Sequence, residues 1–250
     1  KFRASYGEIG ADTLGDPFDS SRRWLYMNQW AYGGNTVMDL DHTNSIYTWY
    51  RQNTLGNKDV KWETVKKTNF GVDYGFLGGL ITGSLDFFCD RRNDILIFGD
   101  NRSIPSYFGT TAPTINKGKV RTSGYELELK LNKKFANGIR LWGNINMTHA
   151  KNKVLLKDDA QLTPNYQKEA GYSMGQYHSY IDRGFINDID DLIGSPAHES
   201  NDNHRLVGDY YIVDFNGDGV VDSKDSAPVG YSSNPQNTYN ATIGIEYKGF

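Results

Sequence analysis

The residues whose types and spacing best fit a defined chemistry lie in one acidic segment, residues 214–225. Side-chain oxygens occur at positions 1, 3, 5, 9 and 12 of this segment, and position 7 offers a backbone carbonyl. Gly219 occupies position 6, where a calcium-binding loop of the EF-hand type turns sharply. The spacing predicts a Ca²⁺ site with the ligands Asp214, Asn216, Asp218, Val220, Asp222 and Asp225.

Two features separate this segment from an EF-hand. The first is position 12, which is Asp225 rather than the usual bidentate glutamate. The flanking residues 210–213 and Pro228 do not read as amphipathic helices. We therefore expect a structural calcium loop inside a long connection rather than a switch. A solvated turn rich in Asp and Asn remains the alternative.

Catalytic patterns are weak by comparison. The five histidines are scattered, and the sequence contains no HExxH spacing, no glycine-rich phosphate loop and no nucleophile elbow. Glu126 and Glu128 would lie about 7 Å apart on one strand face, a spacing that a glycosidase could use. Their expected neighbours, Asn146, Thr148 and Lys130, fit a polar interior better. We predict that the protein is not an enzyme.

Aromatic residues are concentrated in a polar stretch near the N-terminus, between residues 24 and 50. Flat rings beside amide and carboxylate groups can hold a sugar or a peptide by stacking and hydrogen bonding. Packing of these rings against their own loop is the alternative. The candidate substrate-binding residues are Trp24, Trp30, Trp49 and Tyr50.

The composition narrows the class of protein. The 250 residues include 17 Tyr, 12 Phe, 5 Trp and 27 Gly, which suits long strands joined by tight turns. The net charge of -3 comes from interspersed signs, so a nucleic-acid partner is not expected. No apolar run approaches the ~20 residues of a membrane-spanning helix. Cys89 is the single cysteine and cannot form an internal disulfide.

These residues must be positioned by long strands, and the clearest is a hairpin from Ser123 to Met147. Odd-numbered residues from Tyr125 to Leu131 are apolar and even-numbered residues from Glu126 to Asn132 are polar, the period of a strand. An odd-length turn with Gly138 in the left-handed region makes the two apolar faces coincide. That register pairs each apolar residue with an apolar partner or glycine: Leu127 with Met147, Leu129 with Ile145, and Leu131 with Gly143.

A second hairpin repeats this design between residues 70 and 87. Its apolar residues change from even to odd numbers, so its loop must have even length. Gly78 and Gly79 predict a two-residue turn with both φ angles positive. Phe76 would then pair with Ile81.

Strand length and connection length together indicate a membrane barrel. Ten residue steps from Tyr125 to Phe135 rise ~25 Å at a tilt of roughly 40°, the height of a lipid-facing band. We count about six such strands, which are too few to close a barrel of at least about eight. Short turns alternate with long polar connections, a pattern typical of outer-membrane barrels. These extracellular loops are expected at about 11–61, 95–118 and 154–235.

Several segments together resemble the SusC/RagA family of TonB-linked outer-membrane transporters. They are residues 3–10, residues 62–88, the pattern N-x-G-x-V-x-x-x-G-Y-E-L-E-L from Asn116 to Leu129, and residues 208–225. The resemblance covers nearly the whole chain and corresponds to a late part of the barrel. It implies that residues 1–250 are part of an all-β, antiparallel barrel of about 22 strands, with the plug domain and the TonB box outside this chain.

The resemblance also implies a function and partners. A member of this family would import oligosaccharides or peptides across the bacterial outer membrane, coupled to the TonB complex through the plug and covered by a SusD-like surface lipoprotein. Polar residues of the strands, such as Glu126, Glu128, Lys130 and Arg140, would line the lumen, and the apolar face would meet outer-membrane lipid. The alternative from another class is a secreted, calcium-stabilised β-sheet adhesin or glycan-binding module.

Overall fold

A computed structural model describes residues 1–11, 23–36 and 47–248. The chain divides into two compact units. One comprises Lys1–Ala160 with Gln236–Phe250, and the other comprises Gln161–Pro235. We call the second unit the insertion, because it interrupts the first between two of its strands.

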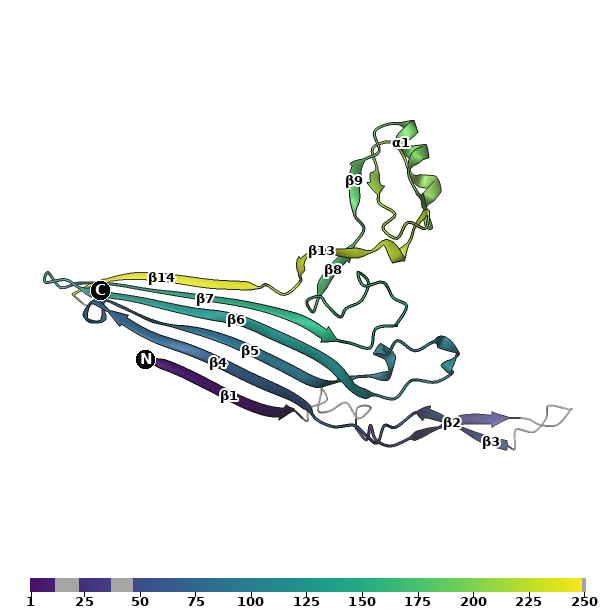
Figure 1. Ribbon diagram of the computed structural model, residues 1–250, viewed down its shortest axis with the longest axis horizontal. Helices are drawn as coiled ribbons and strands as arrows, with labels where there is room; N and C mark the ends of the chain where they lie inside the picture. The colour runs from purple at the N-terminus through teal and green to yellow at the C-terminus, as the bar shows by residue number, and fades with distance from the viewer. Residues whose placement is uncertain (12–22, 37–46, 249–250) are drawn as a thin grey trace. The chain divides into compact units, whose positions relative to one another are not determined.

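The first unit contains one sheet of six antiparallel strands (Figure 1). In pairing order they are β1 (Phe2–Ala11), β4 (Glu63–Phe76), β5 (Ile81–Ile97), β6 (Ile115–Lys134), β7 (Ile139–Leu156) and β14 (Asn237–Tyr247). β4 to β7 are consecutive and pair as neighbours, joined by short turns at one end of the sheet and a longer loop at the other. The sheet is therefore a segment of antiparallel wall, as the alternation predicts.

The cross-strand register of the first hairpin is the predicted one. Leu127 faces Met147, Leu129 faces Ile145 and Leu131 faces Gly143. Gly138 has a φ of 83°, and the Phe135 amide donates to the Ile139 carbonyl at 2.8 Å. An odd loop with one left-handed glycine thus brings the two apolar faces together.

The second hairpin has the predicted register and a longer turn than expected. Phe76 faces Ile81 as predicted. The chain between them forms the short 3-10 element η2 (Leu77–Gly79), in which Leu77, Gly78 and Gly79 all have positive φ angles. The loop therefore spans four residues instead of two, because Leu77 also adopts a left-handed conformation. Both loop lengths are even, so every side chain of the hairpin lies on the face of the sheet that the sequence predicts.

The apolar face of the sheet is exposed. Ile243 has 81% of its surface accessible, and Phe70, Phe87 and Ile145 are exposed as well. Among the described residues, no further strand pairs with this sheet, whose six strands appear as a single layer in Figure 1. A soluble β-sandwich would bury these side chains between two sheets. The arrangement instead fits a wall whose apolar face meets lipid.

Connections at the loop-bearing end are tied to the strands by polar contacts. Asn116 in β6 accepts from the Lys61 amide at 2.9 Å and donates to the carbonyls of Lys61 and Asp94 at 2.8 and 2.7 Å. Asp158 accepts from Arg102 at 3.1 Å and pairs with Lys117. Burial raises the pKa of Asp158, but hydrogen bonds from Lys117 and Arg102 outweigh burial and lower the pKa overall. These contacts fix the bases of the loops.

The remaining elements are short. In the first unit they are β2 (Gln29–Thr36), which pairs with β3 (Tyr47–Thr54), and the 3-10 turns η3 (Gly99–Asn101) and η4 (Ser106–Phe108). In the insertion they are β8 (Gln176–Ser179), β9 (Asp182–Phe185), α1 (Ile189–Gly194), β10 (Ala197–His198), η5 (Asp202–His204), β11 (Tyr210–Ile212), β12 (Val220–Val221), η6 (Ser223–Asp225) and β13 (Ala227–Ser232). No helix in the described part of the chain is long and apolar enough to cross a membrane.

The insertion has a small core of its own. It contains three two-stranded pairs, β8 with β13, β9 with β11 and β10 with β12, and its buried side chains include those of Ile186, Val221, Ala227 and Asp225. Asp225 is fully buried although it carries a carboxylate, which requires hydrogen-bond partners.

Candidate functional site: the polar face of the sheet and the acidic loop

The polar face of the sheet is organised around ion pairs that cross strands. Arg3 in β1 lies opposite Gly71 in β4, and Gly71 lies opposite Asp86 in β5. Because Gly71 has no side chain, Arg3 can reach over β4 to Asp86 at 2.8 Å, and it also pairs with Asp73 at 2.9 Å. A Cβ on Gly71 would collide with the Asp86 carboxylate. The glycine therefore permits an ion pair across three strands.

The predicted lumen residues share this face. Glu128 pairs with Lys130 at 2.6 Å, and Arg140 pairs with Glu246 of β14 at 3.3 Å. Glu126 faces Thr148 and Glu128 faces Asn146, as the sequence predicts. Because Lys130 pairs with Glu128, Glu126 and Glu128 do not form the isolated acid–base pair that glycoside hydrolysis needs.

Two aromatic rings on the polar face lie over glycines of the neighbouring strand. Trp142 in β7 packs onto Gly244 in β14, and Phe88 in β5 packs onto Gly124 in β6. A Cβ on either glycine would collide with the ring. These pairs were not predicted from the sequence. An aromatic residue opposite a glycine in the predicted register would have been the signal.

The candidate substrate-binding aromatics do not form one platform. Trp30 and Tyr50 belong to β2 and β3, where Tyr50 lies opposite Tyr32 with ring centroids 6.0 Å apart. A register shift between Tyr32 and Gly34 places the Trp49 ring against Gly33 instead. Trp24 precedes the hairpin, and its ring packs edge-on against Tyr26 with the ring centroids 6.1 Å apart. Trp24, Trp30, Trp49 and Tyr50 are all exposed, and their role in binding substrate stays a prediction.

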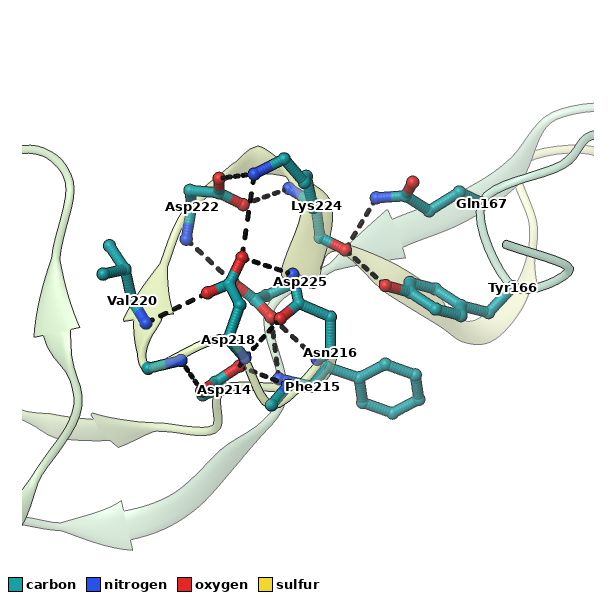
Figure 2. Close-up of polar contacts among 12 residues, drawn as sticks. Tyr166, Gln167, Asp214, Phe215, Asn216, Asp218, Val220, Asp222, Lys224 and Asp225 are labelled. Atoms are coloured by element: carbon teal, nitrogen blue, oxygen red, sulfur yellow. Dashed lines mark hydrogen bonds and ion pairs between the residues drawn. The ribbon is translucent and has the colours of Figure 1, made fainter. Parts of the chain in front are cut away.

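The acidic loop of the insertion is held by its own carboxylates. Asp225 accepts hydrogen bonds from the amides of Phe215 at 2.8 Å, Asn216 at 3.1 Å and Asp222 at 2.8 Å, as Figure 2 shows. Asp214 accepts from Gly217 at 2.7 Å and from Gly219 at 2.6 Å, two glycines with positive φ angles. The side chains at positions 1 and 12 therefore fold the loop from its two ends.

Lys224 supplies a cation on one side of this loop. Its ammonium lies 2.7 Å from Asp222 and 3.7 Å from Asp218 (Figure 2). The hydrogen bond to the Lys224 ammonium, together with one from the Lys224 amide, lowers the pKa of Asp222. Burial and the surrounding carboxylates raise the pKa of Tyr166, whose hydroxyl donates to the Lys224 carbonyl at 2.8 Å. Negative charge thus dominates the surroundings of the loop.

Calcium binding at this loop stays a prediction. In the described residues, no three His, Cys, Asp or Glu side chains are gathered in a way that could hold a metal ion. The donor set nevertheless fits a hard cation, since Asp214, Asn216, Asp218, Asp222 and Asp225 all present oxygen. A bound Ca²⁺ would have to displace the Lys224 ammonium from Asp218 and Asp222.

Comparison with known proteins agrees with this architecture. The model of the family described as TonB dependent receptor-like, beta-barrel, matches residues 1–249. TonB-dependent receptor P3 of Formosa agariphila is 24% identical over 100% of this chain and 24% of its own length. TonB-dependent receptor SusC of Bacteroides thetaiotaomicron is 28% identical over 52% of this chain and 12% of its own length.

Solved structures show the same fold. The RagAB peptide importer in the 'closed-closed' state matches with a TM-score of 0.64 and 18% identity, over 99% of this chain and 25% of that chain. Its 'open-open' state matches with the same TM-score and 16% identity. The chain spans about a quarter of the length of these structures and of TonB-dependent receptor P3. Its sequence relatives are receptors rather than enzymes. The chain belongs to the TonB dependent receptor-like β-barrel family and forms a segment of its barrel.

Proposed function

We propose that this chain forms part of the wall of an importer that moves oligosaccharides or peptides across the bacterial outer membrane, with energy supplied through TonB. The apolar face of the sheet carries this proposal, because its side chains are exposed or half-buried along strands of up to 20 residues, with no core behind them in the described part of the chain. A face of this kind requires hydrocarbon around it, whereas the opposite face carries the ion pairs of a wet interior.

Passage through the wall would depend on its polar face. Arg3, Asp86, Lys130 and Arg140 present charges of both signs along the strands. Such a surface can guide a polar solute without making or breaking covalent bonds. The exposed rings of Trp30 and Tyr50 would supply stacking surfaces for a sugar or a peptide at the loop-bearing end.

A SusD-like surface lipoprotein is the proposed partner at the long loops. Support comes from the similarity to SusC and from the match to RagAB, whose structures are described as a peptide importer in open and closed states. The insertion offers exposed apolar side chains beside acidic ones, including Phe185, Ile189 and Ile193. A mixed surface of this kind suits a partner that has to dock and release.

Uptake by cells carrying the full-length transporter tests the proposal. Cells with and without the transporter gene would be supplied with labelled peptides or labelled oligosaccharides of similar size. We expect the transporter to appear in the outer-membrane fraction and one class of solute to enter only when it and TonB are present. Recovery in the aqueous fraction without detergent would instead support the secreted adhesin or glycan-binding module.

A further inference from the structure

The apolar face carries a continuous row of rings near the middle of four of its strands. Phe70, Phe87, Tyr125 and His149 face one another in turn across β4, β5, β6 and β7. The ring centroids of Phe87 and Tyr125 are 6.4 Å apart, and those of Tyr125 and His149 are 5.3 Å apart. We call these four residues the aromatic row. Its position matches the ring girdle that marks the edge of hydrocarbon on a membrane barrel.

A second row on the same face is entirely cationic. Lys66, Arg91, Arg121 and Lys153 face one another in turn across the same four strands. Each lies four residues beyond its counterpart in the aromatic row, and an even separation keeps a side chain on the same face of a strand. All four side chains are exposed. We call these residues the cationic row.

The cationic row has too few acidic partners. Lys66 pairs with Glu8 at 3.7 Å, but in the part of the chain that the structure describes, Arg91, Arg121 and Lys153 have no acidic side chain within ion-pair distance. On the polar face, by contrast, Lys67 pairs with Asp90, Lys130 with Glu128 and Arg140 with Glu246. Like charges directly opposite across strands are destabilising. Such a row therefore calls for an anionic ligand from outside the sheet.

The height of the row identifies that ligand. Four residues correspond to roughly 13 Å along a strand, or about 10 Å above the aromatic row at a tilt of about 40°. Lipid headgroups begin just beyond the hydrocarbon, and long cationic side chains can reach them. We propose that the cationic row binds the phosphate groups of an anionic lipid in the outer leaflet. This inference rests on the proposed function, which places the apolar face against a membrane.

The chemistry of the row suits phosphate. Arg91 and Arg121 occupy its centre, and guanidinium groups bind phosphate oxygens through two parallel hydrogen bonds. Lys66 and Lys153 flank them as point charges on flexible stems. Neighbouring strands lie about 4.8 Å apart, so phosphate groups on one glycolipid headgroup could contact several strands at once.

Lipid binding by the full-length transporter in mild detergent tests the proposal. The probes are bis-phosphorylated lipid A, its dephosphorylated form and inorganic phosphate, each added in EDTA so that divalent cations do not bridge charges. Binding is counted by native mass spectrometry. The test variant combines Arg91→Gln, Arg121→Gln and Lys153→Gln. The control variant combines Lys67→Gln, Arg92→Gln and Lys130→Gln, which removes three cations from the polar face.

We expect the wild type to retain lipid A, and the test variant to bind it about 10- to 100-fold more weakly. Dephosphorylated lipid should bind the wild type as weakly as lipid A binds the test variant, and the control variant should resemble the wild type. The inference would be overturned if the test variant bound lipid A as tightly as the wild type does, or if the control variant lost as much binding as the test variant. It would also be overturned if the wild type bound inorganic phosphate but not lipid A.

Failure of this inference is distinguishable from failure of the proposed function. If the transporter fractionates with the outer membrane and supports uptake while both variants bind lipid A equally, only the lipid site is wrong. If the transporter is recovered in the aqueous fraction, the membrane placement itself is wrong and the lipid site falls with it.

Discussion

The sheet and the insertion are built on opposite principles. Strands of the sheet run for 10 to 20 residues, bond to their neighbours through the backbone and leave their apolar side chains exposed or half-buried. Strands of the insertion have two to six residues, and its loops are held by carboxylates such as Asp225 that accept backbone hydrogen bonds. Acidic residues outnumber basic ones about three to one in residues 161–235. The sheet is suited to hydrocarbon and the insertion to water, within one chain.

The largest expected effect comes from Asp225→Ala in the full-length protein. Three part-buried amide donors would lose their acceptor, and the buried carboxylate that orders the loop would be gone, which should destabilise the insertion by about 4 kcal/mol. Limited proteolysis should cut the insertion of the variant rapidly while the sheet stays resistant. Asp190→Ala, at an exposed carboxylate in the first turn of α1, is the matched control and should change stability by less than about 0.5 kcal/mol. Simultaneous loss of the sheet would contradict the independence of the two units.

A charge on the apolar face should break the sheet rather than the insertion. Leu129→Arg is expected to cost about 2–4 kcal/mol because Leu129 lies between the two ends of the lipid-facing band. Urea unfolding of the transporter refolded into liposomes would measure the cost. Asn146→Arg, on the exposed polar face of β7, should be tolerated. Equal effects of the two substitutions would show that the faces do not differ in their surroundings.

Calcium should act on the insertion alone. At a free Ca²⁺ concentration 100 times the dissociation constant, binding would stabilise the insertion by about 2.7 kcal/mol. Calorimetry should detect heat with the wild type and none with the Asp214→Ala, Asp218→Ala double variant. Removal of the metal by EDTA should then speed proteolysis of the insertion without changing the unfolding of the sheet. Equal, negligible heats for both proteins would leave a solvated turn as the correct interpretation.

A smaller effect should distinguish two glycines of the sheet. Gly71→Ala would place a methyl group against Asp86 and 3.0 Å from the Arg3 guanidinium, at a cost of about 1–3 kcal/mol. Gly7→Ala in β1 adds a methyl group with no heavy atom within 4 Å and should be nearly neutral. Thermal unfolding in detergent would compare the two variants. Similar midpoints would mean that the ion pair across β4 contributes little.

The sheet could be predicted because its pattern is local. Alternation around Leu129 and the parity of the loop at Gly138 were enough to fix the facing residues. The four-residue turn was missed because the left-handed Leu77 runs against the preference of its residue type. The cationic row was also not predicted, because Arg91, Arg121 and Lys153 become neighbours only in the register that aligns β5, β6 and β7.

The insertion was predictable only at its acidic loop. The burial of Ile186 and Asp225 depends on contacts between strands of two to six residues, which carry too little periodicity to detect. In the aromatic hairpin, Trp49 and Tyr50 are consecutive in β3 and therefore lie on opposite faces. The register shift between Tyr32 and Gly34 places the Trp49 ring against Gly33, and no composition argument reveals such a shift. Residue types alone therefore identified candidate substrate-binding residues but not their positions relative to one another.

The pairing of β1 and β14 has a consequence for biogenesis. Each has a single strand neighbour in the described sheet, which leaves one ladder of amides and carbonyls on each without a partner. Hydrocarbon cannot solvate those groups, so an intermediate that exposed them inside a bilayer would be strongly disfavoured. In a bilayer, where we propose that this wall lies, membrane insertion would therefore be favourable only together with the pairing of both margins to further strands.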